Sequence, residues 1–127
     1  MGQNAIVIEN LDTLLESLDQ ADLVAEWRVL PTIGPDWIGG GRFIEFYLGE
    51  QKLAENQFQK RLCQILIERL NIPEKSPDDR EMMVGEGDIL LKDRDLVIEF
   101  HWYKTVPYMH HHDSGGGACI FLALNAG

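Results

Sequence analysis

Apolar residues recur every three or four positions in the first part of the chain. They fall at Leu11, Leu14, Leu15, Leu18, Ala21, Val24 and Trp27. This is the period of one face of an α-helix, and Asn10 and Asp12 suit its N-terminal end. The pattern therefore predicts a helix over residues 11–27, ended by the prolines and glycines that follow. The apolar run at 5–8 is compatible with an edge strand or with an extension of that helix.

The remainder of the chain combines one more helical pattern with several strand patterns. Residues 42–48 are rich in aromatic and β-branched side chains and predict a strand, and the apolar spacing over 50–70 predicts the second helix. Residues 87–103 predict a hairpin with its turn near Asp93 and Arg94. Residues 118–124 predict a further strand, central in the sheet because both of its faces are apolar.

This order of elements predicts the fold class. A helix, a strand, a helix and then three strands favour an α+β domain. We expect a mainly antiparallel sheet of four to five strands, with two α-helices packed on one face. The 127 residues suit a single globular domain spanning 1–127.

The predicted strand from residue 95 to 103 gives the sheet a second, polar face. Alternation places Val97, Glu99, His101 and Tyr103 on that side, and Phe43, Glu45 and Tyr47 join them if the strand at 42–48 lies nearby. Aromatic residues with scattered charges suit a recognition surface. An ordinary solvated face, or one covered by loops, is the alternative.

The net charge limits the class of partner. Twenty-one acidic residues face eleven basic ones, for a formal charge of −10 and a pI near 4.7. Such a field disfavours direct nucleic-acid binding and anionic membranes, and it attracts basic proteins. Six acidic residues and no Lys or Arg precede Trp27, which indicates either a solvated helix face or a docking surface for a basic protein.

The four histidines lie within residues 101–112, and three of them are consecutive. His101, His110, His112 and Asp113 include enough nitrogen and oxygen donors for zinc. Their spacing matches no strong zinc motif, and no nucleophile lies on a catalytic pattern such as GxSxG. A metal site is therefore the alternative hypothesis, and the sequence favours a non-enzymatic role without deciding the question.

The glycine-rich runs and the cysteines suggest no further chemistry. "GGG" at 39–41 and "SGGGA" at 114–118 lead into strands without a nearby Lys, so we expect hinges or loop ends, and "GEGD" at 85–88 suggests a turn. Cys63 and Cys119 have apolar neighbours and are expected to be buried thiols. With no signal peptide and no apolar run near 18 residues, the expected location is the cytoplasm.

We therefore expect a small acidic interaction protein of the inhibitor, immunity or adaptor type that binds a basic partner protein. The expected binding residues are Glu45, Tyr47, Glu99, His101 and Tyr103, or else the acidic face of the first helix. The alternative is a metal-dependent enzyme or metal-binding sensor that holds zinc through His101, His110, His112 and Asp113. No other cofactor is expected, and a homodimer is compatible with the sequence.

Overall fold

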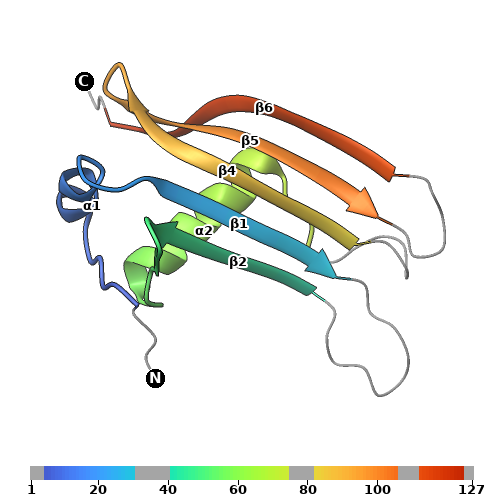
Figure 1. Ribbon diagram of the computed structural model, residues 1–127, viewed down its shortest axis with the longest axis horizontal. Helices are drawn as coiled ribbons and strands as arrows, with labels where there is room; N and C mark the ends of the chain where they lie inside the picture. The colour runs from blue at the N-terminus through green and yellow to red at the C-terminus, as the bar shows by residue number, and fades with distance from the viewer. Residues whose placement is uncertain (1–4, 31–40, 75–81, 106–111, 125–127) are drawn as a thin grey trace.

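A computed structural model of the protein describes residues 5–30, 41–74, 82–105 and 112–124 (Figure 1). In chain order the elements are α1 (Leu11–Ser17), β1 (Leu23–Leu30), β2 (Gly41–Leu48), β3 (Gln51–Lys52), α2 (Gln57–Leu70), β4 (Met82–Lys92), β5 (Asp95–Thr105) and β6 (His112–Ala123). The strands form one sheet in the order β3-β2-β1-β4-β5-β6, and all neighbours are antiparallel. The α+β class is confirmed, and the described sheet has six strands rather than four to five.

The first predicted helix was too long. α1 ends at Ser17, and the last residues of the predicted helix, 23–27, belong to the strand β1, which continues to Leu30. Alternate residues of β1 are buried, namely Leu23, Ala25, Trp27 and Val29, while Glu26 and Arg28 between them are exposed. Pairing with β2 on one side and β4 on the other stabilises the extended backbone, so tertiary contacts override the helical spacing. The predicted cap is confirmed, because Asn10 Oδ1 accepts a hydrogen bond of 2.9 Å from Thr13 N.

The second helix begins later than predicted, at Gln57 instead of Glu50. Gly49 has a left-handed backbone (φ +65°) and turns the chain, so that β3 pairs back onto Tyr47 and Leu48. Asn56 then caps α2 by accepting a hydrogen bond of 2.8 Å from Gln59 N. The run at 5–8 belongs to neither regular helix nor regular strand, because Ile6 makes only an isolated parallel bridge to Leu53.

The predicted hairpin is confirmed as β4 and β5. Its two turn residues, Asp93 and Arg94, have φ values of 49° and 73°, as a two-residue turn of type I′ requires. β4 is longer than predicted and includes residues 85–88. The predicted turn at "GEGD" is therefore wrong. The glycine run at 39–41, predicted as a hinge or loop end, lies outside the described residues except for Gly41, the first residue of β2.

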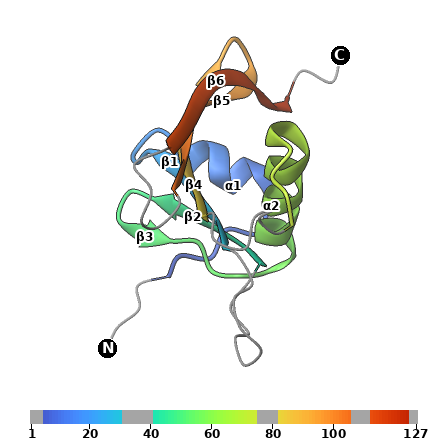
Figure 2. The ribbon, with the colours of Figure 1, turned by 90° about the vertical axis from the view of Figure 1, so that its right-hand side faces the viewer.

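The core combines one face of the sheet with side chains from both helices. Leu14 of α1 and Leu62 and Leu66 of α2 belong to the same buried cluster as the buried residues of β1. Figures 1 and 2 show α2 running across the sheet. It contacts β6 and β2, and Arg69 Nε donates to Phe121 O over 3.3 Å. The two cysteines are free and half-buried.

Glycines in the strands make room for large side chains of the neighbouring strand on the buried face. The Trp27 ring lies against Gly85, and the Trp102 ring lies against Gly115. A Cβ at Gly85 would be 2.3 Å from two Trp27 ring carbons, and one at Gly115 would be 2.6 Å from Trp102 Cζ2. The run at 114–118 is thus part of β6, and the hinge prediction is wrong there. Trp27 Nε1 is buried without a hydrogen-bond partner among the described residues.

The position of β6 also differs from the prediction. The apolar character of residues 118–124 predicted a central strand, but β6 is the last strand of the described sheet and pairs only with β5. One of its long edges is therefore left without a strand partner in the part of the chain that the structure describes.

Candidate partner-binding surface

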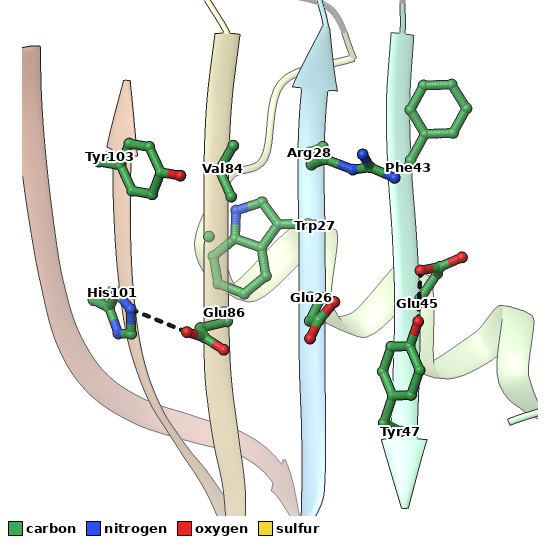
Figure 3. A pocket seen from close by; sticks show the side chains of 11 residues that line it. Glu26, Trp27, Arg28, Phe43, Glu45, Tyr47, Val84, Glu86, His101 and Tyr103 are labelled. Atoms are coloured by element: carbon green, nitrogen blue, oxygen red, sulfur yellow. Dashed lines mark hydrogen bonds and ion pairs between the residues drawn. The ribbon is translucent and has the colours of Figure 1, made fainter. Parts of the chain in front are cut away.

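The exposed face of the sheet carries a row of carboxylates across three adjacent strands. Glu26 of β1 pairs with Glu45 of β2 on one side and with Glu86 of β4 on the other. We call these three residues the carboxylate row. His101 of β5 pairs with Glu86 and continues the row by one strand. Figure 3 shows the four side chains in line, all on one side of the sheet.

Aromatic side chains flank this row on both sides. Along the strands the next row contains Phe43, Arg28, Val84 and Tyr103. Phe43 is 45% exposed and Tyr103 is 44% exposed, and they stand at opposite ends of that row. On the other side the row begins with Tyr47 and ends with Glu99.

Together these side chains surround a hollow of about 490 Å³. It is lined by the carboxylate row, by His101 and Arg28, and by aromatic residues that include Phe43, Tyr47 and Tyr103 as well as the buried Trp27, as Figure 3 shows. Negative charge at the centre with aromatic rings at the edges suits a basic side chain, since cations are attracted both to carboxylates and to ring faces.

Glu45 has two partners on its own side of the surface. Lys52 Nζ lies 2.8 Å from Glu45 Oε2, and Tyr47 donates its hydroxyl to Glu45 Oε1 over 3.0 Å. The hydrogen bond from Lys52 is the main cause that lowers the pKa of Glu45, and burial acts in the opposite direction. The same contacts raise the pKa of Lys52 and the pKa of Tyr47, because each group keeps its proton to bond the carboxylate.

Glu86 and Glu26, the other two members of the row, have no Lys or Arg counter-ion among the described residues. Glu86 Oε1 lies 3.4 Å from His101 Nε2, a pair that is ionic only when the imidazole is protonated. Glu26 forms no ion pair or side-chain hydrogen bond with another described residue. It lies between two other carboxylates, and like charges directly opposite one another are unfavourable. The centre of the row is therefore the place where an added cation would gain most.

Four of the five predicted binding residues line this hollow. Glu45, Tyr47, His101 and Tyr103 come together from β2 and β5 although two strands separate them. Glu99 lies on the same face outside the lining, and Lys92 Nζ contacts its carboxylate at 2.7 Å.

Sequence reasoning missed the middle of the surface. Glu26 lay within the predicted first helix, and Arg28 came directly after it. Val84 lay just before the predicted turn at 85–88, and Glu86 lay within that turn. The signal that could have found them is the alternation of small or apolar residues with polar ones over 23–30 and 84–89.

The predicted metal ligands are only partly within the described residues. His101 lies on the exposed face, whereas Asp113 pairs with Lys104 and lies by alternation on the opposite side of the sheet. The backbone of His112 pairs with Thr105, and His110 is outside the described residues. The described residues contain no group of three or more His, Cys, Asp or Glu arranged to hold a metal. The metal hypothesis stays a prediction.

The acidic start of the chain forms a separate surface. Asp12 and Glu16 are exposed on α1, and Glu9, Asp19 and Asp22 are exposed beside it. Glu26, the last of the six acidic residues in this region, lies instead on the exposed face of the sheet.

No helix in the described ranges is both long enough and apolar enough to cross a membrane. Comparisons with known protein families, with curated proteins and with solved structures found no match.

Proposed function

We propose that this protein binds a basic partner protein through the exposed face of its sheet, as an inhibitor, an immunity protein or an adaptor does. The carboxylate row beside the exposed rings of Phe43 and Tyr103 is the observation that carries the proposal. The proposal takes both helices to cover the buried face, so that the partner approaches the other face freely.

Electrostatics and aromatic burial have different roles in this binding. The net charge of −10 draws a basic partner toward the protein and speeds the encounter. Affinity comes mostly from contacts at the centre of the interface, where aromatic and Arg side chains contribute most. An Arg or Lys of the partner is expected to enter the hollow and pair with Glu26, which has no counter-ion among the described residues.

Capture with matched variants tests both the function and the place of binding. The sheet-face variant Glu26→Gln/Glu86→Gln removes two negative charges from the carboxylate row. The control Asp12→Asn/Glu16→Gln removes two from exposed positions of α1. Each tagged protein is mixed with lysate, captured proteins are identified by mass spectrometry, and the affinity of any captured basic protein is measured with purified components.

The proposal expects one basic protein that binds the wild type and the α1 variant and binds the sheet-face variant at least about tenfold more weakly. Binding should also weaken between low and physiological salt, because exposed charges are screened over about 8 Å at physiological ionic strength. Loss of binding in the α1 variant alone would move the site to the acidic helix. Equal binding by all three proteins, or no basic partner, would contradict the proposal.

A further inference from the structure

The outer edge of β6 is a long run of unpaired strand backbone. β6 has 12 residues and pairs on one side only, with β5. The pairing is regular from Thr105 opposite His112 to Val97 opposite Ile120, and a register shift follows. In the described part of the chain no strand pairs with its other side.

Between Ser114 and Ile120, before the register shift, this edge lacks the features that usually protect edge strands. Soluble proteins guard their sheet edges with short strands, charged side chains, prolines or bulges. The opposite edge follows that rule, since β3 has only two residues, one of them Lys52, and the part of β2 that β3 leaves unpaired carries the charged residues Arg42 and Glu45. From Ser114 to Ile120, β6 has no charged residue and no proline, and most of these residues are exposed. Its sequence suits a central strand, although it lies at an edge.

The charge distribution favours a second copy of this chain at this edge. Two copies that each carry −10 repel one another over most of their surface, whereas the strip from Ser114 to Ile120 is uncharged. A strand can pair antiparallel with itself about a two-fold axis, because its free N–H and C=O groups complement those of the other copy. The only acidic residue of β6, Asp113, lies near one end of the strand and thus away from the axis.

We infer that the protein forms a homodimer in which the two β6 strands pair antiparallel about a two-fold axis near Ala118. In this register Ile120, which is 47% exposed, lies opposite Gly116 of the second copy. The contact repeats the arrangement of Trp102 against Gly115 within one chain. The two Asp113 carboxylates lie on either side of the axis, at opposite ends of the interface.

The symmetry fixes how the two carboxylate rows are presented. An antiparallel pairing of identical edges requires an axis perpendicular to the sheet, so the sheets continue into one another with their exposed faces on the same side. The dimer would then offer two copies of the hollow to one side. Self-association itself does not depend on the proposed partner.

A charge placed at the axis tests this pairing in the protein alone. Ala118→Lys brings two like charges together across the interface, and it also adds a typical edge-protecting residue. The matched control is Gln51→Lys, which adds the same charge at an exposed position of the other edge. Sedimentation equilibrium gives the oligomeric state of each protein from low micromolar to near-millimolar concentration, and circular dichroism checks that each is folded.

The wild type and Gln51→Lys are expected to be dimers, and Ala118→Lys is expected to dissociate at least about fivefold more readily. Hydrogen exchange should show amides of residues 114–120 that are protected in the concentrated wild type and exchange faster on dilution. A monomeric wild type over the whole range would overturn the inference, as would dimers that Ala118→Lys leaves intact. A monomer whose 114–120 amides become protected only when a peptide is added would show strand addition by another protein instead.

Discussion

Gly85 is the strand position at which a methyl group should be most damaging. Its substitution Gly85→Ala adds a Cβ that would lie 2.3 Å from Cε2 and Cζ2 of Trp27, where carbon atoms normally stay about 3.5 Å apart. Trp27 is 2% exposed and surrounded by core residues, so the ring has little room to move by the missing ångström. Overpacking of this kind costs about 1–3 kcal/mol.

Part of that cost is offset in the unfolded chain. Replacing Gly by Ala reduces the conformational freedom of the unfolded state and contributes about 0.4–1 kcal/mol of stability. We therefore expect Gly85→Ala to lower the free energy of unfolding by about 1–2 kcal/mol, which corresponds to a fall in Tm of about 4–8 °C for a chain of this size. Urea and thermal unfolding followed by circular dichroism measure both quantities.

Gly117→Ala is the matched control, because a Cβ there would be 3.6 Å from Phe100 Cζ, an ordinary contact. It should leave stability unchanged within about 0.5 kcal/mol or raise it slightly. Trp27→Leu removes the ring. Its loss of unfolding free energy should be smaller in the Gly85→Ala background than in the wild type, with a coupling energy of about 1 kcal/mol or more. Equal stability of the two alanine variants would refute the close approach of Trp27 to Gly85.

Four further predictions concern the caps, the cysteine and the surface carboxylates. Asn56→Ala should destabilise the fold by about 1–2 kcal/mol in urea unfolding, because its side chain bonds Gln59 N at 2.8 Å and Ile8 O at 3.0 Å. Burial raises the pKa of Cys63 from 9.0 to about 11, so thiol labelling at pH 8 should be about a hundredfold slower in the native than in the unfolded protein. The lowered pKa of Glu45 means that its contact with Lys52 stabilises the fold above the ordinary value of 4.5 and is lost as the pH falls through the folded value. The stability difference between wild type and Glu45→Gln, below about 1 kcal/mol for so exposed a pair, should therefore vanish in acid. Finally, Glu26→Gln should raise the free energy of unfolding by about 0.5 kcal/mol, because it removes the middle of three adjacent carboxylates.

Local sequence signals predicted the elements whose boundaries are set by local chemistry. The strand at 42–48 and the hairpin turn at Asp93 and Arg94 are of this kind. The first helix failed because residues 18–27 satisfy two periods at once. Leu18, Ala21 and Trp27 fit the helical spacing, whereas Leu23, Ala25 and Trp27 fit the alternation of a strand. Only the pairing with β2 and β4 decides between them, and that information is not local.

The turn and the hinge predicted from the glycine runs were wrong for a related reason. The sequence predicted a turn at Gly85 and a hinge at Gly115, because the ring that covers each glycine belongs to another strand. Trp27 covers Gly85 and Trp102 covers Gly115, and neither contact can be recognised from the residues beside the glycine. The same error hid Glu86, and the helix error hid Glu26. Sequence alternation therefore found the two outer parts of the surface on β2 and β5, and the two strands between them carried the residues that it missed.

The cost of the carboxylate row is itself an argument about its role. A face exposed only to solvent gains stability from alternating charges across its strands, and Lys52 and Lys92 show that this chain uses such pairs at the margins of the face. At the centre it places Glu26 between Glu45 and Glu86, an arrangement that a single Gln would relieve. Residues that lower stability often do so for binding. If Glu26→Gln stabilises the free protein and also weakens capture of the basic partner, the row serves binding. The repulsion among its carboxylates in the free protein is then relieved when a cation of the partner binds. If it stabilises the protein and leaves binding unchanged, the row has no part in recognition, and the acidic residues around α1 become the stronger candidate.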